Sequence, residues 1–205
     1  SAASDVYKRQ ANNKGKGLAL YLIGEEPLEK GMRILGAHID SPRLDLKQNP
    51  LYEDQELALL DTHYYGGVKK YQWVTLPLAL HGVVSKKDGE NVTVVIGEAE
   101  QDPVLGISDL LIHLSQKQLQ KTAAEVVEGE KLDMLVGSIP LEGEEEEPVK
   151  AQILAILKEK YGIEEEDFLS AEFEVVPAGK ARDYGLDRSM IMGCLLYTSD
   201  AADDR

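Results

Sequence analysis

The sequence is poor in cysteine and in basic residues, and both shortages narrow its possible functions. Cys194 is the single cysteine among 205 residues, so no disulfide can form within the chain, as is usual in a reducing compartment. Lysine and arginine number 22 against 37 aspartates and glutamates, which gives a formal net charge of −15. This balance argues against nucleic acid and against an anionic membrane surface as partners, because both attract basic proteins.

Long apolar runs are missing as well. No run approaches the roughly 20 residues that a membrane-spanning helix needs, and the first residues contain no apolar signal core. Apolar residues still make up 43% of the chain and charged residues 29%, a composition typical of a domain with a packed core. We therefore expect a cytoplasmic protein with one ordinary domain or two small ones.

The two ends of the chain differ from the rest. Residues 1–10 (SAASDVYKRQ) and 194–205 (CLLYTSDAADDR) show no periodic apolar pattern. Both resemble peptides translated from sequencing-adapter DNA, and ordinary disordered termini are the alternative interpretation. We predict that both are non-native tails, and we base the fold prediction on residues 11–193.

The first part of that range predicts buried strands. Residues 18–23 (LALYLI) and 32–37 (MRILGA) are short apolar runs separated by turn-forming residues, a pattern typical of strands inside a sheet. His38 is then expected just past the C-terminal end of a central strand. In open α/β sheets, ligands and catalytic groups collect at that edge.

The remainder predicts antiparallel β-structure followed by a mixture of helix and strand. Alternating apolar residues predict strands at 43–47, 59–65, 73–84 and 92–96, with a loop at 50–56 and a hairpin turn at Asp88-Gly89. Ser108 as N-cap predicts a helix over 108–119, residues 133–147 resemble a linker, Pro148 opens a second helix, and residues 168–176 form a strand that ends at 177–179.

His38 and Asp40 are the residues best suited to metal chemistry. A zinc-bound imidazole commonly has a carboxylate nearby that fixes the ring. Residues two apart on an extended segment point to the same side, so Asp40 can support His38 at one site. A His-x-Asp pair also arises often by chance, and a strand-end histidine bonded to a neighbouring carboxylate is the structural alternative.

A series of short blocks around this pair resembles the aspartyl aminopeptidase family of zinc metallopeptidases, in the family's order. The blocks are Gly36 to Lys47, Thr62 to Val68, Trp73, Leu76 to Gly82, Asp102 to Ile107, Leu111 to Leu114, Asp167-Phe168, Pro177-Ala178 and Gly185 to Met190. The resemblance implies two zinc ions, with His38 as a metal ligand and Asp40 as a catalytic residue beside the bridged metal pair. It also implies release of N-terminal amino acids from peptides through a metal-bridging water, with Asp or Glu preferred in many members.

The resemblance further implies an α/β fold in which a phosphorylase/hydrolase-like catalytic domain is split by a β-rich dimerisation domain. The catalytic parts would be residues 11–45 and 178–193, and the insertion residues 46–177. His113 matches the histidine that reaches a neighbouring subunit's active site and binds substrate, although a helix-surface or core histidine is the structural alternative. Homodimers would build a larger homo-oligomer, a dodecamer in the family.

The chain departs from the family's pattern at its end. The bridging Asp, the Glu pair, a later Asp and the last His of the family find no match here, and Asp203-Asp204-Arg205 lies too far beyond Ser189 to replace them. A catalytic zinc takes about three protein ligands plus water, which one His and one Asp do not supply. We therefore expect these 205 residues to lack tight zinc binding and peptidase activity.

Two other interpretations stay open. In the first, the chain is a fragment from a related family of cocatalytic-zinc aminopeptidases. The blocks at 63–67 (HYYGG) and 111–114 (LIHL) argue against this interpretation. Alternatively, it acts as a non-catalytic assembly or interaction module, because the insertion is complete while the metal site is not.

Overall fold

The computed structural model describes residues 8–13, 17–38 and 41–193. The chain divides into two compact units, residues 1–40 and residues 41–205. We call them unit 1 and unit 2 and describe each by itself.

The described residues of unit 1 contain a single hairpin. β1 (Lys8–Asn13) pairs antiparallel with β2 (Gly17–Leu22), and a short 3-10 turn, η1 (Leu28–Lys30), follows. The strand predicted at 18–23 is present as β2, but its predicted burial is wrong, because Leu20 is 72% exposed. The strand predicted at 32–37 is absent, and Leu35 is 98% exposed. The reason is that a two-stranded hairpin offers no second layer to cover an apolar face.

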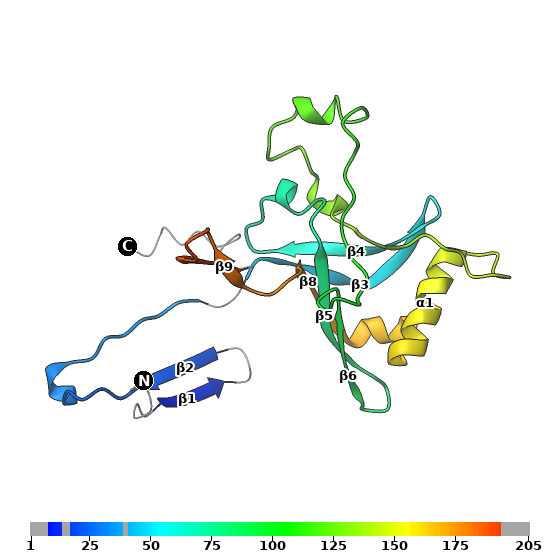
Figure 1. Ribbon diagram of the computed structural model, residues 1–205. Coiled ribbons are helices and arrows are strands. Elements are labelled where there is room, and N and C mark those ends of the chain that lie inside the picture. The colour runs from blue at the N-terminus through cyan, green and yellow to red at the C-terminus, as the bar shows by residue number, and fades with distance from the viewer. Residues whose placement is uncertain (1–7, 14–16, 39–40, 194–205) are drawn as a thin grey trace. The chain divides into compact units, whose positions relative to one another are not determined.

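Unit 2 is built on a six-stranded sheet with the strand order β6-β5-β8-β3-β4-β7 (Figure 1). Every neighbouring pair in it is antiparallel. The strands are β3 (Arg43–Asp54), β4 (Leu57–Tyr65), β5 (Leu78–Ser85), β6 (Asn91–Ile96), β7 (Met134–Gly137) and β8 (Ala171–Pro177). The antiparallel β-structure predicted for the middle of the chain is confirmed.

Turn chemistry explains the β5–β6 hairpin of this sheet. Lys86 N donates to Glu90 O at 2.8 Å across the β5–β6 turn, and Gly89 has a φ of 88° there, as the Asp-Gly pair predicts. The predicted loop at 50–56 is wrong, because β3 runs on to Asp54. Leu51 is 5% exposed and pairs with Leu60 beyond a break in register, so its burial carries the strand through the polar stretch.

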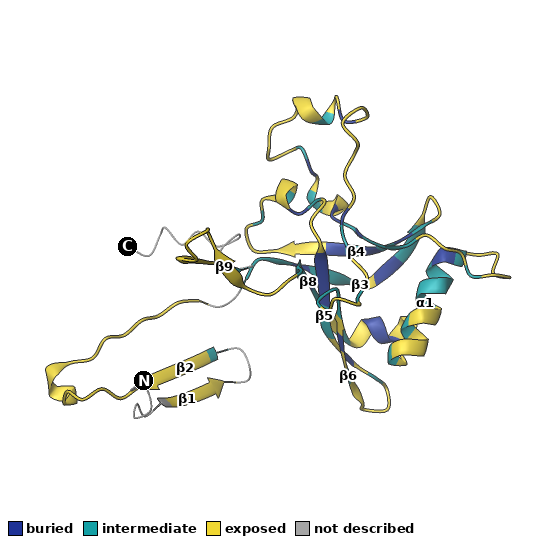
Figure 2. Ribbon diagram, in the orientation of Figure 1, coloured by how far each residue is buried: buried dark blue, intermediate teal, exposed yellow. Residues whose placement is uncertain are grey.

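One face of the sheet packs against the only α-helix among the described residues, α1 (Pro148–Tyr161), which begins at the predicted proline. The burial map shows that buried residues concentrate on the sheet and at the start of α1 (Figure 2). The largest fully buried side chains come from both layers and from the loops between them: Leu44, Leu78, Leu132, Met134, Ile163, Val84, Val94, Val149 and Val175. Unit 2 therefore has its own hydrophobic core.

The start of α1 is capped from a distant strand. Glu147 precedes the helix with a left-handed φ of 43° and makes no side-chain cap. Glu53 Oε2, on β3, accepts hydrogen bonds from the backbone N–H groups of Val149 at 2.8 Å and Lys150 at 3.0 Å. These donors have no partner within the helix, and a carboxylate there also faces the positive end of the helix dipole.

Three further predictions need correction. Residues 108–117 form no helix, and only a 3-10 turn, η3 (Gln118–Gln120), follows them. An amphipathic segment becomes a stable helix mainly by burying its apolar face, and here Leu111 and Leu114 are 71% and 69% exposed. The predicted linker contains β7, because Met134 is buried against β4. The strand predicted from residue 168 begins at Ala171, because a 3-10 turn, η5 (Glu165–Ser170), precedes it.

Short elements complete unit 2. They are two further 3-10 turns, η2 (Lys70–Gln72) and η4 (Gly129–Lys131), and a small hairpin of β9 (Arg182–Tyr184) and β10 (Met190–Met192). Among the described residues, no helix is both long and apolar enough to cross a membrane.

Candidate functional site

His38 lies at the end of the irregular, exposed segment that closes the described part of unit 1. The expected strand before it is absent, since residues 31–38 have no regular structure. Asp40 lies outside the described residues.

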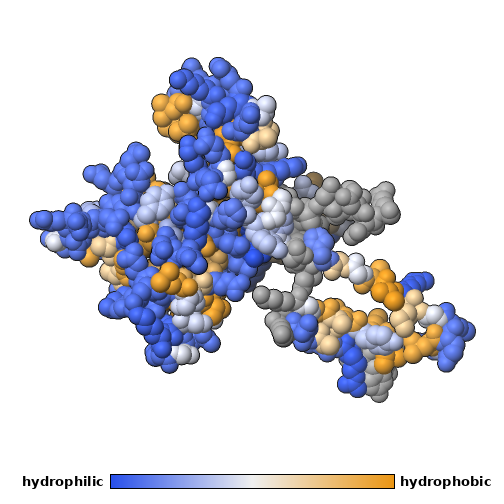
Figure 3. Space-filling view, turned by 180° about the vertical axis from the view of Figure 1, so that it is seen from behind, coloured by the Kyte–Doolittle hydropathy of each residue, from blue (hydrophilic) through white to orange (hydrophobic). Residues whose placement is uncertain are grey.

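His113 belongs to unit 2 and lies on an exposed turn, where Leu114 N donates to Leu111 O at 2.8 Å. Its neighbours Leu111 and Ile112 are 71% and 65% exposed. Figure 3 shows apolar atoms at the surface of the lobe that this loop forms above the sheet. An apolar segment that is this exposed is typical of a surface that contacts another protein.

The described residues do not compose a zinc site. Nowhere in residues 8–13, 17–38 and 41–193 do three or more His, Cys, Asp or Glu side chains lie close enough together to hold a metal ion. A catalytic zinc takes about three protein ligands. The ligand chemistry of His38 suits zinc, but the described part of the chain does not complete the set.

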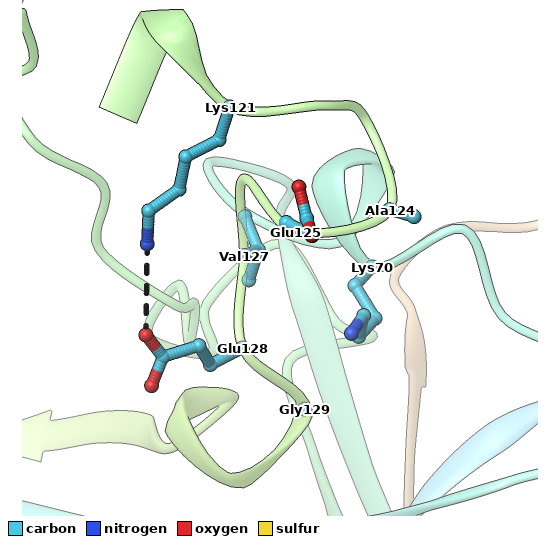
Figure 4. Close-up of a pocket in the computed structure, with 7 residues that line it drawn as sticks. All are labelled: Lys70, Lys121, Ala124, Glu125, Val127, Glu128 and Gly129. Atoms are coloured by element: carbon cyan, nitrogen blue, oxygen red, sulfur yellow. Dashed lines mark ion pairs between the residues drawn. The ribbon is translucent and has the colours of Figure 1, made fainter. Parts of the chain in front are cut away.

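A pocket of about 550 Å³ lies beside η4, between the loop at 121–129 and Lys70 (Figure 4). Two of its lining residues pair with each other: Lys121 Nζ lies 3.7 Å from Glu128 Oε1. Glu125 accepts a hydrogen bond from the Thr122 hydroxyl at 2.8 Å. None of its described lining residues is a histidine, and its Glu128 pairs with Lys121, so it does not match the predicted metal or substrate residues.

A partly buried polar cluster joins β3, β4 and the segment just before β7. Tyr52 donates its phenolic hydrogen to Asp133 Oδ2 at 2.7 Å, and Thr62 Oγ1 donates to Leu132 O at 2.7 Å. Burial raises the pKa of Asp133, and burial followed by this hydrogen bond raises the pKa of Tyr52. Both shifts follow from the packing of the sheet, because burial disfavours the charged form of each group.

Sequence reasoning missed the contacts of Glu98. Glu98 Oε1 lies 2.9 Å from His81 Nε2, and Glu98 Oε2 accepts a hydrogen bond from the backbone N–H of Gly179 at 3.1 Å. These partners come from β5 and from the segment after β8. No motif or spacing in the sequence brings the three residues together, so only the folded sheet reveals the contact.

Comparison with known proteins identifies the family of this chain. A family model described as aminopeptidase I zinc metalloprotease (M18) matches residues 7–198. A probable M18 family aminopeptidase 1 from Clostridium acetobutylicum is 68% identical over 187 residues, which are 91% of this chain and 40% of the relative. A relative of the same description from Thermotoga maritima is 50% identical over 88% of this chain and 40% of its own length.

Solved structures agree with the sequence matches. The crystal structure of aminopeptidase I from C. acetobutylicum aligns with a TM-score of 0.76 at 66% identity, over 91% of this chain and 41% of that one. The M18 aminopeptidase from T. maritima aligns with a TM-score of 0.78 at 49% identity, over 92% of this chain and 42% of that one. The sheet-dominated fold described above is therefore shared with M18 aminopeptidases.

The curated relatives are much longer than this chain, which spans about 40% of their length. The match nevertheless covers all of the described residues of both units. The chain belongs to the M18 family of aminopeptidase I zinc metalloproteases.

Proposed function

We propose that this chain is part of a zinc-dependent aminopeptidase that releases N-terminal amino acids from peptides. The family match over residues 7–198 carries the proposal, and the C. acetobutylicum relative, named a probable M18 aminopeptidase, supports it. The finer parts of the proposal are two zinc ions in the active site and a preference for N-terminal Asp or Glu. Cytoplasmic location and non-native tails at 1–10 and 194–205 stay predictions.

Within this enzyme, His38 is proposed as a zinc ligand and Asp40 as the catalytic carboxylate that orients it. Imidazole is a common zinc ligand, and a carboxylate two residues on is suited to fix its ring. The described residues do not complete a ligand set, so the remaining ligands are expected in the part of the relatives' length that this chain does not span. Residues 11–45 and 178–193 are proposed as parts of the catalytic domain.

His113 is proposed as a substrate-binding residue that acts in a neighbouring subunit. Its place on an exposed turn between exposed leucine and isoleucine side chains supports this, because such a loop is suited to contact a partner. We propose a homodimer, formed through the insertion at 46–177, that builds a larger homo-oligomer. A distant fold relative, S. cerevisiae mApe1, was solved as a dodecamer and aligns with a TM-score of 0.53 at 18% identity.

A second candidate function is assembly alone. Unit 2 has its own core of buried strands and helix, while the described residues contain no metal-ligand cluster. In this form, the polypeptide as given contributes subunit contacts and no catalysis. The proposal that these 205 residues are inactive on their own is common to both candidates.

A chimaera tests the proposed function. Residues 11–193 of this chain would replace the matching segment of the C. acetobutylicum aminopeptidase, whose 68% identity makes the exchange conservative. We expect zinc-dependent release of N-terminal amino acids, a loss of at least about 100-fold in kcat/KM on His38→Ala, and little change on His63→Ala, an exposed histidine of β4. Full activity of the His38→Ala variant would refute the ligand assignment, and an inactive chimaera beside an active relative would refute the proposed function.

A further inference from the structure

The chain enters and leaves the sheet of unit 2 on two neighbouring strands. β3 begins at Arg43 and β8 ends at Pro177. Leu44 pairs with Val175, and Asp45 pairs with Glu174. We call residues 42–45 and 174–179 the neck. Under the proposed function, the neck is where the inserted domain meets both parts of the catalytic domain.

Arg43 holds the entry side of the neck. Its Nε lies 2.7 Å from Asp45 Oδ1 and 3.1 Å from Glu174 Oε1 on the neighbouring strand. The guanidinium carbon also lies 4.1 Å from the centre of the Tyr65 ring. These contacts tie β3 to β8 and to the end of β4, so the entry is fixed within the sheet itself.

On the exit side of the neck, other contacts hold the chain, because strand pairing in the sheet ends with β8 at Pro177. Ala178 N donates to Pro77 O at 2.9 Å. The next amide, Gly179 N, donates to Glu98 Oε2 at 3.1 Å, while Glu98 Oε1 lies 2.9 Å from His81 Nε2. A single carboxylate from the loop after β6 therefore connects β5 to the departing chain.

Gly179 is where the direction of the departing chain is set. Its φ is 110°, in the region that glycine adopts readily and other residues rarely do. Because glycine has many accessible conformations, an outside contact is needed to select one. The bond to Glu98 supplies it, and a hydrogen bond to a charged acceptor is stronger than one between neutral groups.

We propose that Glu98 is a positioning residue, which fixes the direction of the chain after β8 and thereby places the segment of β9 and β10 in the assembled aminopeptidase. The clasp of His81, Glu98 and Gly179 is a property of this chain. Only the consequence for catalysis rests on the proposed function.

Surface ion pairs contribute little to stability in general, so a stability measurement alone does not test the clasp. The side chains of His81 and Glu98 are 39% and 24% exposed, and neither residue belongs to the hydrophobic core. We expect Glu98→Ala to make the chain around Gly179 more mobile while the sheet stays folded. This separates a positioning role from a merely structural one.

The first test measures amide-hydrogen exchange in the 205-residue chain by NMR. Glu98→Ala is expected to speed exchange at Gly179 about tenfold, the effect of losing a hydrogen bond to a charged group, while the buried Val175 amide keeps its rate. Glu100→Ala is the matched control, an exposed glutamate on the same loop, and should change neither rate. An unchanged rate at Gly179, or equal acceleration at Val175, would overturn the clasp.

The second test uses the chimaera. Glu98→Ala should lower kcat about tenfold with KM nearly constant and an unchanged melting temperature, and Glu98→Gln, whose amide oxygen still accepts one bond, should recover part of the loss. A chimaera that is inactive before this substitution refutes the proposed function and leaves the exchange result standing. An active chimaera that is indifferent to Glu98→Ala refutes the positioning role.

Discussion

At the scale of single residues, Asp133, just before β7, shows how partial burial changes the pKa of a carboxyl group. Burial is the largest influence on its carboxyl and raises its pKa above the ordinary value, while the bonds from Tyr52 and Thr62 act in the opposite direction. The protonated carboxyl is therefore more favoured in the folded state than in the unfolded chain. The resulting contribution to stability is complete below the pKa of the unfolded chain, about 4, and is lost as pH rises through the higher folded pKa.

Asp133→Asn tests this directly, because asparagine keeps the shape of the neutral carboxyl. We expect the free energy of unfolding of the variant, relative to the original chain, to increase between pH 4 and pH 7. Urea titrations at both pH values measure the difference. Asp54→Asn is the control, an exposed carboxylate at the end of β3, and should show no comparable trend. A difference that falls with rising pH would mean that burial does not dominate at Asp133.

At the scale of elements, the start of α1 depends on a residue far away in the sequence. Glu53 on β3 accepts two backbone hydrogen bonds at the helix start, and residue 147 provides no cap of its own. We expect Glu53→Ala to lower the free energy of unfolding by about 1 kcal/mol, the usual effect of removing a helix cap. Thermal unfolding followed by circular dichroism measures this.

Glu172→Ala is the matched control for the cap, since Glu172 is an exposed glutamate on β8. Its effect should stay within a few tenths of a kcal/mol, as is usual for surface positions. If both variants unfold at the same temperature, the contact between Glu53 and the helix start contributes nothing to stability.

The same scale shows what sequence patterns predict here. Local signals were sufficient for the hairpin at Asp88-Gly89 and for the start of α1 at Pro148, because turn geometry and helix entry depend on adjacent residues. They failed at 32–37 and 108–119. The apolar spacing there predicts buried elements, but the leucine and isoleucine side chains of both segments are exposed. Burial depends on partners distant in sequence or in another chain.

The residues of interest likewise fall into those that sequence motifs predict and those that only the fold reveals. His38, Asp40 and His113 were found through motif blocks, and the structure describes the first and last of these only as exposed residues in separate units. Glu53 and Glu98 had no sequence signal, because the backbone amides that they bind, those of Val149 and Gly179, lie 96 and 81 residues away. Only the pairing of β3, β5 and β8 brings such residues together.

At the scale of the whole molecule, the exposed loop around His113 tests the proposed assembly. We expect Ile112→Asp to weaken self-association, since a charge in an apolar contact loses its hydration without gaining a partner. Ile139→Asp is the control, because Ile139 is equally apolar and 72% exposed elsewhere in unit 2. Light scattering with and without zinc gives the oligomeric state. Identical assembly of both variants would exclude this loop from the interface.

The central proposal is that this chain contributes His38 to the metal site of an M18 aminopeptidase and does not form that site alone. Zinc content, measured by mass spectrometry after dialysis, tests it most directly. We expect no stoichiometric zinc on the 205-residue chain and two zinc ions per subunit on the chimaera, with His38→Ala reducing that number. Stoichiometric, tightly held zinc on the chain by itself, together with aminopeptidase turnover, would contradict the account.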